Sequence, residues 1–125
     1  MKIKNEVLVN SVQVLSKLNN AELPVKVSYK LAKNIKNIEK ELSIYEEEKQ
    51  KLINKYSEKD EEGKSKVNEN GMINILDVEN WNKDIKELLE IEVEINVEKI
   101  NIDELAKSDL KLTPAELILI DYMIK

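Results

Sequence analysis

The most constraining feature of this chain is a heptad pattern that runs through its middle third. Eight positions follow one another at alternating spacings of four and three residues, and seven of them are apolar or aromatic: Leu31, Ile35, Ile38, Leu42, Tyr45, Lys49, Leu52 and Tyr56. This spacing predicts one stripe along a long α-helix. A helix of roughly 30 residues is about 45 Å long, more than a chain of 125 residues needs to enclose its own core. We therefore expect the stripe to pack partly against another part of the chain or against another molecule.

The composition predicts one folded domain, 1–125, without disulfide chemistry. Hydrophobic residues make up 42% of the chain, which is enough for a modest core, while aromatic residues make up only 4%. The chain has no His, no Cys and no Arg, since all of its 20 cations are Lys. These absences remove thiolate zinc sites, the commonest general base and the side chain that best recognises phosphate.

No arrangement of residues in the sequence is typical of a catalytic or metal site. Ser residues occur without His and outside any glycine-rich elbow, and the two glycines cannot form a phosphate-binding loop. The acidic stretch Asp60-Glu61-Glu62-Gly63 differs from a calcium-binding loop because its Gly is fourth and its acids are consecutive. We expect a solvated loop there, and we expect no enzymatic activity, no cofactor and no metal.

Helix signals define four expected helices and their ends. The expected helices cover residues 6–18 with Asn5 as N-cap, 25–57 after Pro24, a third after Asp77 with Trp81, Ile85, Leu88 and Leu89 facing inward, and 114–124 after a capping box at Thr113 and Glu116. The last of these is rich in Leu and Ile on all sides. We expect it to be buried, with an oligomer contact as the alternative.

Two regions indicate β-structure. Residues 64–68 and 72–76 flank Asn70-Gly71, the pair favoured in a type I′ turn, and residues 91–98 alternate between apolar and polar. A frame shift before Ile100 suggests a bulge near Glu98–Lys99. We expect one three-stranded antiparallel sheet and hence an α+β fold, mainly helical with one long helix. Residues 1–60 are expected to form a helical hairpin, and 64–125 a β-hairpin, a helix, a strand and the C-terminal helix.

Charge is unevenly distributed along the chain. Residues 1–40 hold eight Lys and three Glu, a net charge of +5, whereas residues 86–104 hold seven acids and two Lys, a net charge of −5. Either these regions face each other in the fold, or one of them faces a charged partner.

The strand expected at 91–98 carries candidate partner-binding acids. Glu92, Glu94 and Glu98 project from its polar face, and side chains two positions apart on a strand lie roughly 6.7 Å apart. That distance is close to the axial spacing of alternate phosphates in one strand of a duplex. The acids are therefore candidates for mimicking a nucleic-acid backbone, with an ordinary solvated strand face as the alternative.

The long helix supplies the other candidate contacts. Lys30, Lys33 and Lys40 lie along one flank, but the acidic chain and the missing Arg argue against direct nucleic-acid binding. We expect this flank to be solvated or to pair with the acidic region. Tyr45, Leu52 and Tyr56 on the stripe are candidates for contact with a partner protein or with a second copy of the chain.

Several stretches resemble a family of small proteins of unknown function that are encoded by phages and prophages of low-GC Gram-positive bacteria. The resemblance rests on Leu15-Ser16-Lys17-Leu18, Leu23–Tyr29, Ala32-Lys33-Asn34, Tyr56, Asp60–Lys64 and Leu112–Leu117. It implies a phage origin, which agrees with the abundance of Lys, Asn, Ile and Glu, whose codons are AT-rich. It implies no catalytic residues.

These observations lead to two functional hypotheses. The first is a non-catalytic protein-binding module that inhibits a host defence complex, in the manner of an anti-CRISPR protein, by steric or nucleic-acid-mimicking occlusion. The second is an assembly factor or chaperone for phage structural proteins, with a homodimer as one form. No apolar run reaches the 18 residues of a membrane span, and the start of the chain does not resemble a signal peptide. We expect the host cell cytoplasm as the location.

Overall fold

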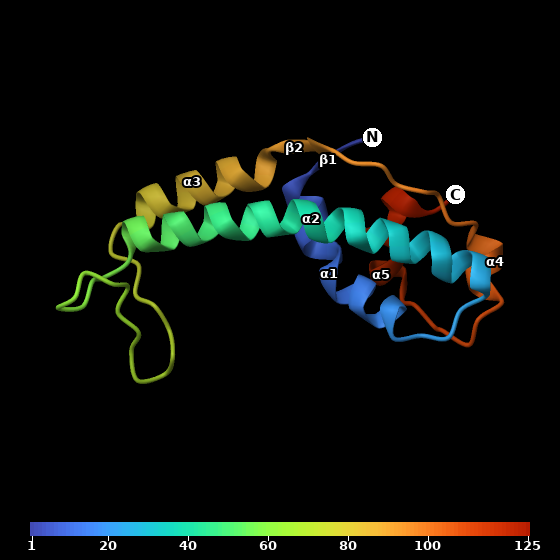
Figure 1. Ribbon diagram of the computed structural model, residues 1–125, viewed down its shortest axis with the longest axis horizontal. Coiled ribbons are helices and arrows are strands. Elements are labelled where there is room, and N and C mark those ends of the chain that lie inside the picture. The colour runs from blue at the N-terminus through green and yellow to red at the C-terminus, as the bar shows by residue number, and fades with distance from the viewer. The chain divides into compact units, whose positions relative to one another are not determined.

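The computed structural model describes residues 1–125 and shows an α+β protein that is mainly helical (Figure 1). Helices hold 59% of the residues, and one of them is much longer than the rest. The chain divides into two compact units, which we describe separately: unit 1 comprises 1–42 and 92–125, and unit 2 comprises 43–91. The expectation of one domain concerns cooperative folding and stays a prediction. None of the helices combines the length and the apolar composition that a membrane span requires.

Unit 1 is built around an apolar core that its short elements share. Its elements are β1 (Lys2–Lys4), α1 (Asn5–Asn19), the first part of α2 (Val25–Tyr56), β2 (Glu92–Glu94), α4 (Ile102–Ala106), α5 (Pro114–Leu119) and the 3₁₀ helix η1 (Asp121–Met123). Its most deeply buried apolar residues are Leu8, Leu18, Ile38, Ile100, Ile120 and Met123. The first stripe residues, Leu31, Ile35, Ile38 and Leu42, belong to this core or pack against it.

The only sheet has two strands, so the expected three-stranded sheet is wrong. β1 pairs antiparallel with β2 in the register Lys2 opposite Glu94 and Lys4 opposite Glu92. The N-terminal strand takes the place that we assigned to 64–76. Its three residues are too few to give a periodic signal, yet they alternate as β2 does, with Ile3 buried and the lysines exposed.

α1 begins directly after β1, without the N-cap that we expected. Lys4 is the N-cap residue and makes no side-chain capping bond, while Asn5 is the first residue of the helix and is buried. Burial in the core outweighs capping preference at this position. The helix otherwise covers the expected range, and α2 follows it after Pro24 and ends at Tyr56, one residue before the predicted end.

After β2 the chain stays extended, and the side-chain amides of Asn34 and Asn37 on α2 form hydrogen bonds with its backbone. The Nδ2 of Asn34 donates to the carbonyl oxygen of Glu98 at 2.9 Å, and the Glu98 N–H donates to the Asn34 Oδ1 at 2.8 Å. Asn37 donates to the carbonyl of Asn96 at 3.0 Å. The expected strand 91–98 is therefore shorter, because beyond Ile95 helix side chains replace a neighbouring strand as hydrogen-bond partners.

The C-terminal segment closes the core of unit 1. The expected capping box is present, since the Thr113 hydroxyl accepts from the Glu116 N–H while Glu116 accepts from the Thr113 N–H. The helix is shorter than the predicted 114–124: α5 ends at Leu119, and Ile120 has a φ of −114° before η1. This break lets both Ile120 and Met123 enter the core. α4, which we did not predict, is a single turn capped by Asn101.

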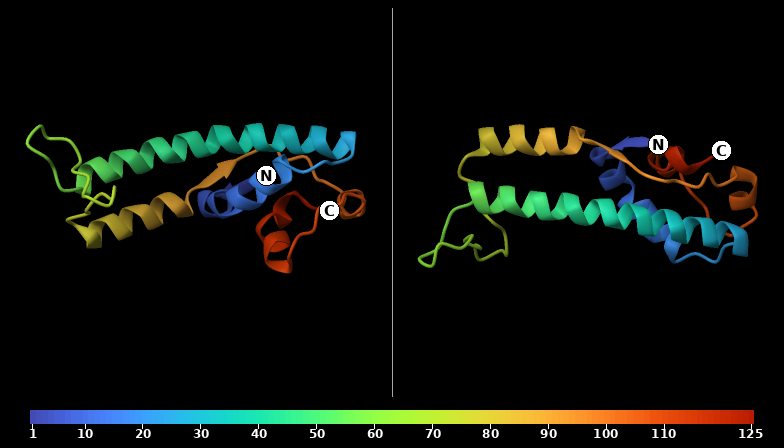
Figure 2. Two further views of the ribbon diagram at one scale, coloured as in Figure 1. Left: turned by 90° about the horizontal axis from the view of Figure 1, so that it is seen from below. Right: turned by 45° about the horizontal axis from the view of Figure 1, so that its top comes forward.

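Unit 2 pairs the last turns of α2 with α3 (Val78–Glu90), which runs antiparallel beside them in both Figure 1 and Figure 2. Asp77 caps α3 as predicted by accepting from the Asn80 N–H at 3.2 Å. The predicted inward face is confirmed by burial: Leu88 is buried, and Trp81, Ile85 and Leu89 are half-buried. The second half of the stripe thus has a partner within the chain.

Residues 57–76 form bridges among three short segments and no extended strand. Ser57 pairs with Ile75, Lys59 with Ser65 and Val67 with Ile73, all antiparallel. Each segment therefore contacts both of the others. The predicted hairpin between 64–68 and 72–76 is present as a single bridge, and it joins 57–59 within unit 2 instead of the strand at 92–94.

The turn at Asn70-Gly71 is not the predicted type I′ turn, because only Gly71 has a positive φ. The Gly71 N–H donates to the Asn68 carbonyl, and the Asn68 N–H donates to the Met72 carbonyl, so the loop has three residues, 69–71. The Asn68 Oδ1 also accepts from the Met72 N–H at 2.9 Å. A type I turn followed by a left-handed Gly explains this pattern.

Candidate interaction surfaces

The acidic strand faces lysines of the same sheet. Because Lys2 and Lys4 lie directly opposite Glu94 and Glu92, their side chains project on the same face of the sheet. The Met1 amino group also pairs with the Glu94 carboxylate at 2.7 Å. That hydrogen bond, followed by the charges of the amino group and of Lys2, lowers the pKa of Glu94. Part of the predicted phosphate-like charge is therefore compensated within unit 1.

Glu98 and the basic flank of α2 also meet. The carboxylate of Glu98 lies 3.6 Å from the Lys33 Nζ, and Lys33 lies over the Tyr29 ring at 4.7 Å from its centroid. These contacts agree with the alternative in which the basic and acidic regions face each other. Lys30 is half-buried beside Ile100 and Glu104, and Lys40 is exposed without an ion pair.

The stripe residues proposed for a partner are partly buried or bonded within the chain. Tyr45 is only 5% exposed, and this burial, followed by the charge of Glu46, raises the pKa of its hydroxyl. Tyr56 donates to the Asp84 carboxylate, and this hydrogen bond raises the pKa of Tyr56. Burial of Tyr45 counts against a partner contact at that residue. Partner binding by the remaining candidates stays a prediction.

Charge separates sharply between the two units. Unit 1 holds twelve Lys and twelve acids, whereas unit 2 holds eight Lys and thirteen acids. The net side-chain charge of the whole chain, −5, therefore resides in unit 2. The charges of residues 1–40 and of most of residues 86–104 cancel because both stretches belong to unit 1.

An open groove of about 360 Å³ runs between α2 and α3 in unit 2. Leu52, Leu88 and Ile91 supply its apolar surface, and three carboxylates from both helices border it: Glu48, Asp84 and Glu87. Lys51 pairs with Glu48 at 2.8 Å, and Tyr56 donates to Asp84, while Glu87 has no partner. Of the predicted residues, only Leu52 reaches this groove.

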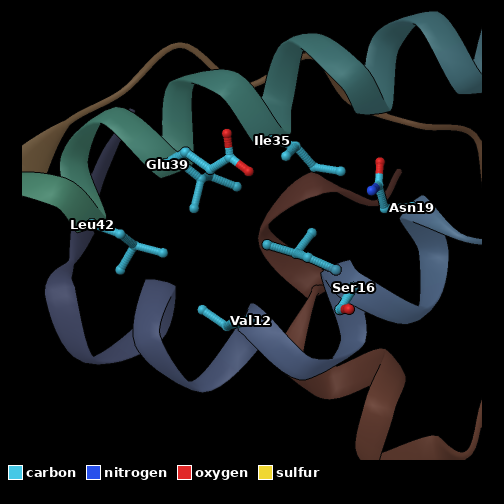
Figure 3. A pocket seen from close by; sticks show the side chains of 8 residues that line it. Val12, Ser16, Asn19, Ile35, Glu39 and Leu42 are labelled. Carbon is cyan, nitrogen blue, oxygen red and sulfur yellow. The ribbon is translucent and has the colours of Figure 1, made fainter.

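A smaller pocket lies in unit 1 between α1 and α2, as Figure 3 shows. Its volume is about 170 Å³, and its walls are apolar: Val12, Leu15, Ile35, Ile38 and Leu42. Ser16, Asn19 and Glu39 add polar groups around it. None of these was predicted as a site, although Ile35 to Leu42 form part of the stripe and Val12 and Leu15 lie on the apolar face of α1.

The acidic loop at Asp60 is organised by its own backbone. The Asp60 Oδ1 accepts from the N–H groups of Glu62 and Lys64, each at 2.9 Å, and Gly63 has a φ of +80°. Asn68 and Gly71 repeat this arrangement eight residues later. The pattern Asx-Glu-x-Gly occurs twice in the sequence and could have revealed the repeat. No group of three or more acidic side chains gathers in a way that could hold a metal ion.

Comparisons with models of protein families, with curated proteins and with solved structures find no match.

Proposed function

We propose that this chain is a non-catalytic, phage-encoded protein-binding module that inhibits a host defence complex by occluding a basic surface. The observation that carries the proposal is the charge of unit 2, which holds the entire net charge of the chain beside an apolar groove. A partner that presents cationic side chains around an apolar anchor would complement this surface.

The groove suits a basic amphipathic segment of a partner. Leu52, Leu88 and Ile91 offer apolar contact area, and Glu87 at the border has no partner of its own. A helix that lays its apolar face into a groove is a common recognition mode. Lys or Arg side chains on the flanks of such a segment would reach the border carboxylates.

Inhibition follows if the occluded surface is one that normally binds nucleic acid. Such surfaces carry clusters of Lys and Arg, and an acidic protein bound there excludes the nucleic-acid backbone. Because lysines lie opposite Glu92 and Glu94, unit 1 resembles a nucleic-acid backbone less than unit 2 does. We therefore place the mimicking charge on unit 2.

The test is capture of the partner from host lysate, followed by competition. Capture with the tagged chain should yield a protein that nucleic acid displaces, and binding should weaken steeply as salt concentration rises. The double variant Glu48→Lys and Glu87→Lys should abolish capture. The matched control, Glu22→Lys with Asp109→Lys, makes the same charge change at two exposed residues of unit 1 and should retain it. If the control variant loses capture of the partner as fully as the Glu48 and Glu87 variant does, the binding surface does not lie on unit 2.

The second candidate, a phage assembly factor or chaperone, is favoured by one different observation. Unit 2 exposes four large apolar side chains between 67 and 78: Val67, Met72, Leu76 and Val78, each more than half exposed. Flexible apolar surface containing Met adapts to varied clients. Binding through it should be insensitive to salt, and Met72→Ser with Leu76→Ser should abolish it while the Glu48 and Glu87 variants retain it.

The remaining parts of the proposal are a location in the host cytoplasm and a homodimer as an alternative form. Light scattering of the purified chain measures its mass directly. A concentration-independent mass of 14.5 kDa would exclude the homodimer, and a mass of twice that value would show one.

A further inference from the structure

The pocket between α1 and α2 in unit 1 carries an inference that goes beyond the proposed function. Its walls are the five apolar side chains named above, of which Leu15 and Ile38 are buried and Val12 is partly exposed at the mouth. At about 170 Å³ it is comparable to an engineered apolar cavity of about 150 Å³ that binds benzene. It therefore has room for one apolar group of benzene size.

The polar groups of the pocket have no partners within the chain. The Ser16 hydroxyl and the Asn19 amide come from the last turns of α1, and the Glu39 carboxylate comes from α2 on the opposite wall (Figure 3). No ion pair or side-chain hydrogen bond engages any of the three. An apolar cavity with a few polar groups on its walls is a common form of a small-ligand site.

The charge of the pocket selects among ligands. Glu39 is its only ionisable lining residue, so a cationic head group gains an ion pair there and an anionic one is repelled. We propose that this pocket binds a small monoamine with an apolar body of benzene size, the body between Leu15 and Ile38 and the ammonium at Glu39.

Affinity for such a ligand is limited by its size. Benzylamine, the probe that we choose, is small and its ion pair with Glu39 is exposed, so we expect a Kd on the order of 1 mM. One exposed ion pair changes affinity by about two- to fivefold. The proposal therefore predicts weak binding with a measurable charge preference.

The experiment is a titration of the ¹⁵N-labelled full chain, followed by amide shifts. Benzylamine should shift amides of α1 around Leu15 and of α2 around Ile38, saturating in the millimolar range. Benzyl alcohol, of the same shape but neutral, should bind about two- to fivefold more weakly, and benzoate more weakly still. Equal affinities for the three probes would overturn the role of Glu39, and absence of saturable shifts in the pocket would overturn the site.

Variants separate the charge from the cavity. Glu39→Gln should remove the preference for benzylamine over benzyl alcohol while leaving benzyl alcohol binding unchanged. The matched control is Glu22→Gln, an exposed and unpaired acid of unit 1, which should preserve the preference. If both variants lose it equally, the general charge of the protein is responsible and the proposal fails.

Filling the pocket gives an independent readout. Ser16 is exposed on α1, so Ser16→Phe should occupy the cavity from its mouth and abolish the shifts by all three probes. Ser16→Ala keeps the cavity open and should retain them. Unchanged binding by the Phe variant, with a normal helical circular dichroism spectrum, would show that the probes bind elsewhere. Failure of this site would leave the proposed function of unit 2 unaffected.

Discussion

At the scale of single residues, Asn34 has the clearest structural role. It is only 1% exposed although it is an amide in the middle of a long helix. Its Nδ2 and its Oδ1 both form hydrogen bonds with the backbone of Glu98, and these bonds replace the ones that a neighbouring strand would make. A polar residue between Leu31 and Ile38 on an apolar helix face is the sequence signal for such a role. We named Asn34 above only within Ala32-Lys33-Asn34, one of the stretches that carry the family resemblance.

Replacement of Asn34 should therefore be costly. Asn34→Ala leaves the N–H and the carbonyl of Glu98 without their partners, and we expect a loss of about 2 kcal/mol or more in the free energy of unfolding. Asn37→Ala, which removes one exposed hydrogen bond, should cost about 0.5–1 kcal/mol. Urea denaturation of both variants measures the difference. Equal costs would mean that the backbone of Glu98 finds other partners.

Glu116 should make stability depend on pH. The Thr113 N–H, followed by Lys17, stabilises its charged form and lowers its pKa below the ordinary value of 4.5. Its stabilising contribution is therefore complete above that value and is lost as the pH falls toward the lowered pKa. Thermal unfolding between pH 7 and pH 3 should show Glu116→Gln with a smaller decrease than the parent chain. A steeper decrease in the variant would contradict the direction of this pKa shift.

At the scale of elements, local chemistry predicted helices well and sheet partners poorly. Thr113, Asp77 and Pro24 act within one helical turn, so their effects could be read from neighbouring residues. The partner of β2 lies about ninety residues away in sequence, and three residues are too short to give a pattern. The turn at Gly71 was assigned incorrectly because Asn-Gly occurs in both two- and three-residue loops. The pocket forms where α1 packs against α2, and no pattern of neighbouring residues in the sequence determines how these two helices pack.

The two Asx-Gly loops should respond alike to mutation. Gly63 and Gly71 have φ values of +80° and +76°, and a Cβ would meet nothing within 4 Å at either site. The cost of Ala is therefore conformational only, about 1–2 kcal/mol at each position. Equilibrium unfolding of Gly63→Ala and Gly71→Ala should give equal losses, with Asn at the same sites better tolerated. A much larger loss at one site would show that its surroundings differ.

At the scale of the whole molecule, the chain combines a neutral unit with a strongly acidic one. The division into units reveals this, because residues 1–40 and most of the acids of residues 86–104 fall in the same unit. A unit with a net charge of −5 repels itself, and salt screens that repulsion. The charges of unit 1 are balanced, so screening has less effect on it.

Salt should therefore stabilise the two units unequally. Raising NaCl from about 0.02 M to about 0.5 M should slow hydrogen exchange of amides in α3 more than that of amides in α1. Exchange followed by NMR gives both values in one sample. Equal slowing would show that the units open together, and slowing confined to α1 would contradict the charge assignment.

The amide of Asn34 also bears on how the protein behaves when it is concentrated. Extended segments with unpaired backbone groups recruit other chains into fibrils. By occupying the backbone of Glu98, Asn34 blocks part of one such edge beside Ile95 and Val97, two residues with high β-propensity. Without that amide, the backbone groups of Glu98 are open to pairing with another chain, and we expect the Asn34→Ala variant to aggregate more readily at high concentration.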